Sequence, residues 1–125
     1  MEIMIDKQTI DKITGELSKD NGNKIKAGYL TGRTESDKII IEGVYVPEQI
    51  SNEGSTTISS EEILKAFTNI ENQRKFIIGF AQYNGSFPVY ESATTRVSRK
   101  RLAQTKKIHN LGLVVNQKGD YKIFQ

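Results

Sequence analysis

The chain of 125 residues lacks cysteine and tryptophan, and it has two prolines and a single histidine, His109. Without cysteine it has no disulfide and no thiolate metal site, which agrees with a reducing compartment. His109 has no acid or cysteine at ligand spacing, so we expect it to pack or lie at the surface. No apolar run approaches the ~18 residues of a membrane-spanning helix, and the N-terminus does not have the pattern of a signal peptide. These absences favour a cytoplasmic protein without a membrane segment, a cofactor or a metal.

The composition fits one small domain over residues 1–125. Apolar residues make up 36% of the chain and charged residues 26%, which is typical of an ordinary hydrophobic core. We find no repeat, low-complexity tract or long linker that would divide the chain.

The first half predicts a strand, a helix and a strand pair. Ile3 and Ile5 alternate with polar neighbours, and apolar residues then follow at helical spacing up to Leu17. Residues 24–31 and 38–46 are rich in β-branched and aromatic side chains and flank a polar turn at 32–37. Residues 51–60 are expected to form a polar loop.

The second half predicts two helices and three strands. Ser59 and Glu62 have the spacing of a capping box, before apolar residues expected on one helix face, namely Ile63, Leu64, Phe67 and Ile70. The apolar run 76–81 is typical of a strand covered on both faces. A helix is expected from Ser92 to about Lys107, with Val97, Leu102 and Ala103 directed inward, followed by a hairpin over 111–124. The expected fold class is therefore α/β, a mixed sheet flanked by helices.

A group of polar residues follows the predicted strand 76–81. Gln82 and Asn84 are separated by one residue, Ser92 comes after seven more, and Thr95 after another two. This spacing resembles the His-x-His-x7-Ser-x-x-Asp signature of the JAB/MPN (JAMM) metalloprotease family, with both histidines and the aspartate replaced. Neutral oxygens and amides give no charge to offset the dehydration of a divalent ion, so we expect no zinc.

The resemblance extends upstream to Gly28-Tyr29-Leu30-Thr31-Gly32, which is similar to a Gly-hydrophobic-Leu-x-Gly strand of that family. In the family a catalytic glutamate precedes this strand, and Ile25 occupies the matching position here. Isoleucine cannot act as the general base that takes a proton from zinc-bound water. Ser92 is the one catalytic group that remains, and in the family it would help to stabilise an oxyanion.

The resemblance implies a cytidine-deaminase-like α/β/α sandwich without catalytic activity. Inactive relatives look like scaffolds in the proteasome lid and related complexes, in a translation initiation factor, or in a core splicing protein. We therefore expect a protein-interaction module, with a homodimer or a heterodimer with an MPN-type domain as a plausible assembly. The chain ends after the predicted hairpin without the long C-terminal helices of the large inactive members, which argues against a role of the lid type.

Basic residues concentrate in the predicted helix 92–107 and give a second hypothesis. The predicted helix has no acidic residue. The net charge of the chain is +3, so the six cations of the helix leave a charge of −3 on the remaining residues. The six cations are Arg96, Arg99, Lys100, Arg101, Lys106 and Lys107. Four of these, Arg96, Arg99, Lys100 and Lys107, could share one face. Such a stripe can contact RNA or an acidic partner, with Tyr83 as an additional contact residue, although a solvated helix face is the common alternative. A third hypothesis, which the residues favour least, is a hydrolase that depends on Ser92.

Overall fold

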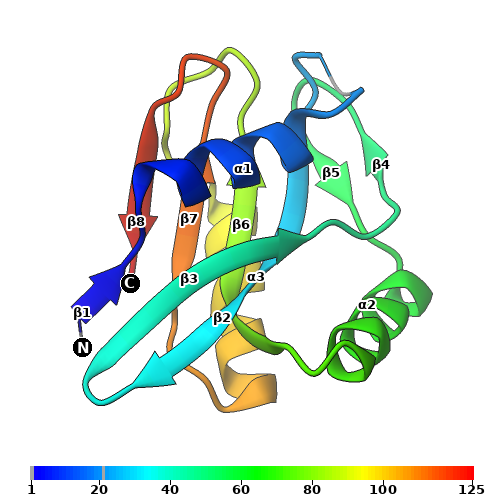
Figure 1. The fold of residues 1–125 in the computed structure, drawn as a ribbon. Helices are drawn as coiled ribbons and strands as arrows, with labels where there is room; N and C mark the ends of the chain where they lie inside the picture. The colour runs from blue at the N-terminus through cyan, green and yellow to red at the C-terminus, as the bar shows by residue number, and fades with distance from the viewer. Residues whose placement is uncertain (1, 21) are drawn as a thin grey trace.

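The architecture is a curled, mixed β-sheet with helices on both faces (Figure 1). The structure is a computed structural model and describes residues 2–20 and 22–125. The six strands of the main sheet are β1 (Glu2–Met4), β2 (Lys26–Glu35), β3 (Lys38–Tyr45), β6 (Phe76–Tyr83), β7 (Gly112–Val115) and β8 (Tyr121–Phe124). The helices are α1 (Lys7–Ser18), α2 (Ser60–Asn72) and α3 (Ala93–Lys106). The predicted α/β class is confirmed.

The spatial order of the sheet is β1-β3-β2-β6-β7-β8. The pairs β1–β3 and β6–β7 are parallel, whereas β3–β2, β2–β6 and β7–β8 are antiparallel. Strands β2 and β6 therefore lie at the centre, and β6 leads through one loop into α3.

Helix α1 covers one face of the sheet. It begins after Asp6, whose carboxylate accepts the backbone N–H of Thr9 at 2.7 Å and satisfies a donor that the helix leaves unpaired. Ile10, Ile13 and Leu17 are buried against the sheet, as their spacing predicts. In Figure 1 the helix crosses in front of the strands and leaves the lower part of this face uncovered.

Helices α2 and α3 lie against the opposite face. Ala66 and Ile70 from α2 and Leu102 from α3 form a second apolar cluster with sheet residues. Ser59 caps α2 by accepting the backbone N–H of Glu62 at 3.2 Å, as expected. The prediction that Val97 points inward is wrong, because it is 53% exposed, and Leu64, expected on the apolar face of α2, is 67% exposed. Both helices contact the sheet along a narrower strip than the apolar pattern indicated.

Two segments are more ordered than expected. Strand β2 continues to Glu35, so the turn to β3 consists of Ser36 and Asp37 alone, with Ser36 in the left-handed region at φ 55°. The predicted polar loop contains a two-stranded hairpin, β4 (Ile50–Ser51) and β5 (Thr56–Thr57). Among the described residues, no helix combines the length and hydrophobicity needed to cross a bilayer.

Candidate functional site

The four polar positions singled out in the sequence come together at one place. Gln82 lies near the end of β6, Asn84 follows the strand, Ser92 caps α3, and Thr95 lies in the first turn of that helix. Gln82, Asn84 and Thr95 are each at least 94% buried. The close approach of the β6 end to the start of α3 therefore places a buried polar cluster between the strand and the helix.

These side chains form a continuous chain of hydrogen bonds. The Thr95 hydroxyl donates to Oε1 of Gln82, and Nε2 of Gln82 donates to Oδ1 of Asn84 at 2.7 Å. Since the Thr95 proton is used in this way, the Ser92 hydroxyl, 2.9 Å away, donates to Thr95 and accepts the backbone N–H of that residue at 3.2 Å. Each amide oxygen is thus occupied by a neighbouring donor.

Asn84 extends the chain of hydrogen bonds into the loop that follows β6. Its Nδ2 donates to the backbone carbonyls of Pro88 at 2.8 Å and Tyr90 at 3.2 Å, and its own backbone N–H donates to Val115 at 2.9 Å. Across the described residues, no buried side-chain nitrogen or oxygen lacks a hydrogen-bond partner. The cluster is therefore internally satisfied, which is the low-energy state for buried polar groups.

Among the described residues that line the site there is no carboxylate, histidine, lysine or arginine. Ile25 lines the same cavity of about 140 Å³ as Gln82, Ser92 and Thr95, and its side chain is a hydrocarbon that cannot take up a proton. In the part of the chain that the structure describes, no three His, Cys, Asp or Glu side chains are grouped so that they could hold a metal ion. The arrangement can hold a loop and a helix in place, but it offers no base to activate water or Ser92.

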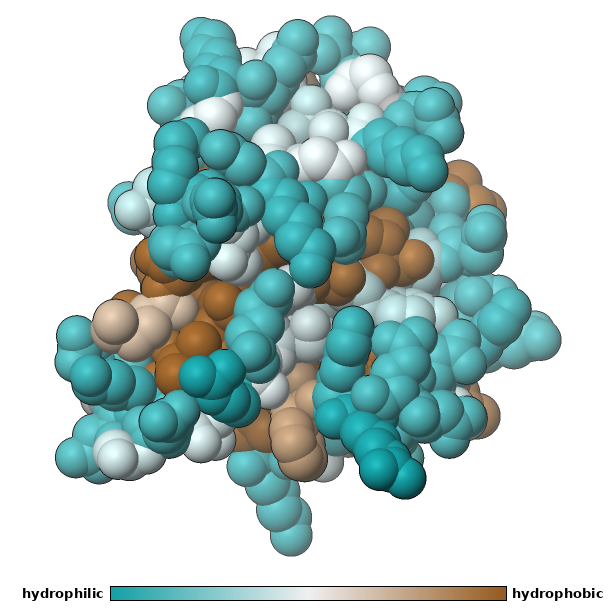
Figure 2. Space-filling view, viewed as in Figure 1, coloured by the Kyte–Doolittle hydropathy of each residue, from teal (hydrophilic) through white to brown (hydrophobic). Residues whose placement is uncertain are grey.

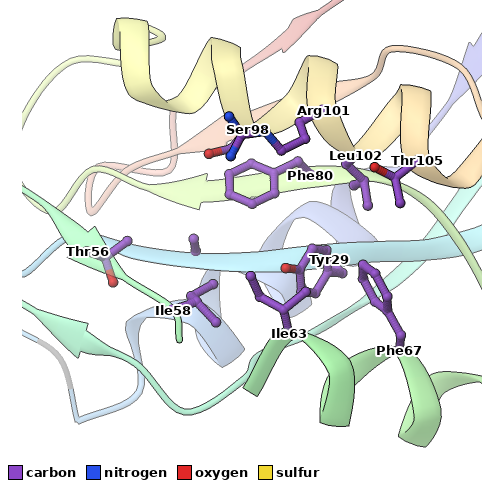
Figure 3. Close-up of a pocket in the computed structure, with 11 residues that line it drawn as sticks. Tyr29, Thr56, Ile58, Ile63, Phe67, Phe80, Ser98, Arg101, Leu102 and Thr105 are labelled. Atoms are coloured by element: carbon purple, nitrogen blue, oxygen red, sulfur yellow. The ribbon is translucent and has the colours of Figure 1, made fainter. Parts of the chain in front are cut away.

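An apolar groove of about 250 Å³ adjoins this site. Ala27, Thr56, Phe80 and Ser98 line both cavities, so the two share a wall. Figure 3 shows its walls: α3 contributes Leu102 and Arg101, and the opposite side is formed by residues 58–67.

Tyr29 and Phe80 form the floor of this groove. The rings of Tyr29 and Phe67 pack edge to face with centroids 5.3 Å apart, and burial raises the pKa of Tyr29 to about 12. Tyr29 packs in the same way on Phe80 at 6.0 Å. Because aromatic rings held at two contacts have little rotational freedom, the floor is preformed rather than created by a ligand.

The hairpin β4–β5 is fastened beside the groove by one side chain. Gln49 accepts the backbone N–H of Ala27 through Oε1 and donates to the carbonyl of Ala27 through Nε2, both at 2.8 Å. Oε1 also accepts the Thr56 hydroxyl at 2.7 Å. The amide of Gln49 thus acts as a strand neighbour for β2 beyond the end of β3. Nothing in the sequence indicated this role, because a glutamine in a polar segment carries no specific signal.

The expected basic stripe on α3 is not a single exposed face. Arg99 is 96% buried; its guanidinium is bound by both carboxylate oxygens of Glu91 at 2.7 and 2.8 Å and by Oδ1 of Asn110 at 2.6 Å. The assignment of Arg99 to a contact surface is therefore wrong. A lone acid just before a basic helix was the available signal for this pair.

The other cations of α3 point in several directions. Arg96 lies 3.4 Å from Glu91, and Lys106 lies 3.5 Å from Glu71 and 4.4 Å from the ring centre of Phe67. Arg101 lines the apolar groove, whereas Lys100 and Lys107 are exposed. A single phosphate-binding stripe along α3 is not supported by this arrangement.

Tyr83 is not available as a contact residue. It is 98% buried in the cluster beneath α1, and its hydroxyl donates to the carbonyl of Gly22 at 3.3 Å. Burial also raises the pKa of its phenol. The strand alternation places Tyr83 on the face opposite Gln82, and this periodicity could have corrected the prediction. His109, by contrast, is exposed, which agrees with the surface position expected for it.

Comparisons with known proteins add no assignment: no protein-family model matches the chain, and no curated protein sequence matches it.

Proposed function

We propose that this protein is a non-catalytic domain of the JAB/MPN type that acts by binding a protein partner. The observation that carries the proposal is the hydrogen-bonded chain from Ser92 through Thr95 and Gln82 to Asn84. Under the proposed resemblance, Gln82, Asn84 and Thr95 match the positions that hold zinc in active members of that family, and here their side chains hydrogen-bond within the same chain. Isoleucine lines the cavity at the position of the general base. An inherited site of this kind supports a structural role for the former catalytic residues.

The binding surface of this proposal is the groove between α2 and α3. Its floor and walls are largely apolar, and the guanidinium of Arg101, which lines it, makes no ion pair or side-chain hydrogen bond to any described residue. An apolar floor beside an unpaired cation suits a partner segment that carries an apolar anchor side chain and a nearby carboxylate. The former active site supports this groove, because its hydrogen bonds fix the start of α3.

Co-purification from native cells with groove-filling variants tests the proposal. Thr105 is exposed and lines the groove, so Thr105→Trp should fill it without disturbing the core. Gln104→Trp places the same side chain at an exposed position of α3 that does not line the groove. We expect nuclease-treated preparations to retain a stoichiometric partner with the wild type and Gln104→Trp, and to lose it with Thr105→Trp. A partner that binds all three proteins equally, or no partner at all, would sink the assignment of the groove.

A metal titration tests the other half of the proposal. We expect the wild-type protein to bind no zinc in equilibrium dialysis and to show no metal-dependent hydrolysis. Any Ser92-dependent cleavage, abolished by Ser92→Ala, would instead establish the hydrolase hypothesis.

A further inference from the structure

The most exposed aromatic side chain of the described residues lies at the other end of β6. Phe76 is 70% exposed and begins the strand, about 20 Å along the backbone from Gln82. Its partner in β2 is Gly32, which has no side chain to cover the ring. A Cβ at Gly32 would collide with the backbone of Ile40, so this position admits only glycine. Because Gly32 has no side chain, it leaves one face of the Phe76 ring uncovered.

Cations from four different segments surround this ring. Phe76 lines two adjoining hollows of about 520 and 470 Å³. The cations that line them are Lys12 from α1, Arg33 from β2, Arg74 and Lys75 after α2, and Lys107 after α3. Two carboxylates, Glu16 and Glu42, line the same hollows. Glu35 also contacts Arg33, so five cations against three acids give this small region an excess of two positive charges.

Most of these cations have no internal role. Arg33 is paired with Glu35 and Glu42. Within the described residues, the side-chain nitrogens of Lys12, Arg74, Lys75 and Lys107 make no ion pair or hydrogen bond. Four unpaired positive charges therefore lie close to an exposed aromatic ring. Covering these charges with an apolar surface would cost free energy, because they would lose their hydration.

Arg74 and Lys107 also occupy unfavourable backbone positions. Each follows the C-terminus of a helix in the left-handed region, at φ 57° and 53°. Glycine is the preferred residue in this conformation, and other residues cost roughly 1 kcal/mol more. A cation at the C-terminus of a helix interacts favourably with the helix dipole, and this interaction offsets part of the cost. Two cations at positions suited to glycine indicate that charge is needed at this end of the molecule.

We propose that the surface around Phe76, formed by Lys12, Arg33, Arg74, Lys75 and Lys107, binds single-stranded nucleic acid. An exposed ring stacks on an unpaired base, and flexible cations neutralise the phosphates on either side. A duplex does not offer a base face to the ring. The surface shares no lining residue with the groove of the proposed function, so the two can be occupied together.

The charge pattern distinguishes this occupant from a protein. Figure 2 shows apolar side chains exposed below α1 among hydrophilic ones, which alone would suit many partners. A second copy of this chain would bring the same unpaired cations against one another, and like charges repel. A single-stranded nucleic acid is complementary to both parts of the surface, because its bases can stack on the Phe76 ring and its phosphates can pair with the cations.

Fluorescence anisotropy with labelled 12-mers of U and dT and a 12-bp duplex tests the proposal. We expect the single strands to bind more tightly than the duplex. With four phosphates contacted, affinity for a single strand should fall about 50-fold between 50 and 200 mM salt. Phe76→Ala should weaken binding at least about fivefold, which is the lower limit for loss of one stacked base. Phe87→Ala is the matched control, because Phe87 is 43% exposed in the loop beyond the other end of β6.

The left-handed positions provide a test that separates binding from folding. Arg74→Gly and Lys107→Gly should weaken binding several-fold while leaving the protein at least as stable in urea. Ser36→Gly relaxes the same conformation without removing a charge, and its affinity should equal that of the wild type. Arg74→Glu with Lys75→Glu should abolish binding, whereas Lys100→Glu with Arg101→Glu on α3 should reduce it only slightly.

Three results would overturn the proposal. The first is no binding of either single strand at 50 mM salt. The second is equal affinity of Phe76→Ala and the wild type. The third is a concentration-dependent dimer in sedimentation analysis that Phe76→Ala dissociates, which would assign the surface to self-association.

Discussion

Arg99 in α3 and Glu91 in the preceding loop form a buried, bidentate ion pair in which Nε and Nη2 meet the two carboxylate oxygens at 2.7 and 2.8 Å. Their side chains are 5% and 2% exposed. Oδ1 of Asn110 accepts a hydrogen bond from the remaining guanidinium nitrogen, Nη1. The ion pair therefore joins the loop, the helix and the segment before β7. A Cβ at Gly112 would lie 2.6 Å from Cδ of Arg99, so glycine at this position makes room for the arginine stem.

Removing the cation should destabilise the whole domain. Arg99→Ala would leave the Glu91 carboxylate buried and unpaired, which typically costs about 3–5 kcal/mol. Urea unfolding followed by circular dichroism measures the change. Arg96→Ala is the control, since Arg96 contacts the same carboxylate but its side chain is 56% exposed, and it should cost less than about 1 kcal/mol. Equal effects of the two substitutions would contradict the structural role assigned to Arg99.

The same pair predicts how stability depends on pH. Burial acts to raise the pKa of Glu91, but hydrogen bonds and charge from Arg99 and Arg96 outweigh it, and the pKa lies below its ordinary value of 4.5. The folded state therefore holds this proton less tightly than the unfolded state, and the stabilisation is complete above about pH 5. It is lost as the pH falls below 4.5 through the folded pKa.

Comparison with Glu91→Gln isolates this contribution. The wild type should exceed the variant in unfolding free energy at pH 6, and the difference should shrink steadily between pH 5 and 3. A difference that stays constant over this range would show that ionisation of Glu91 does not stabilise the fold.

Local patterns in the sequence were sufficient for the order of the elements. Apolar residues at helical spacing identified Ile10, Ile13 and Leu17 as buried, and the Ser59 cap located the start of α2. The spacing of Gln82 and Thr95 indicated a shared site, and the structure brings these two side chains together. Such features depend on neighbours within a strand, a turn of helix or one strand-to-helix connection.

The features that sequence analysis missed depend on distant partners. Arg99 has a charge typical of a surface residue, and only Glu91 and Gly112 on other segments allow it to be buried. Leu64 has the helical spacing of a core residue, yet no other segment covers it and it is 67% exposed. Neither outcome follows from composition or periodicity, because both are set by which segment packs against which.

The amide of Gln49 should control the order of the hairpin β4–β5. Gln49→Ala removes both hydrogen bonds to Ala27 and the one from Thr56, and a typical hydrogen bond contributes about 1 kcal/mol. We expect faster hydrogen exchange in residues 50–57 and at the Ala27 amide, while α1 and β7 keep the protection of the wild type. Gln117→Ala, at an exposed position where the side chain makes no hydrogen bond to a described residue, should change neither region. Uniform loss of protection would indicate global destabilisation instead.

Restoring the family's ligands should create a zinc site if the proposed relationship is correct. The side chain of Gln82 is hydrogen-bonded to both Asn84 and Thr95, so the replacements Gln82→His, Asn84→His and Thr95→Asp would bring three ligands close together. Three such ligands with an open fourth position are the usual set for catalytic zinc. We expect the triple variant to bind one metal ion per chain, with Co²⁺ giving the strong visible absorption of tetrahedral coordination. A triple alanine variant is the control for changes in packing and should bind none. A folded triple His-His-Asp variant that binds no metal would mean that the matching spacing is coincidental.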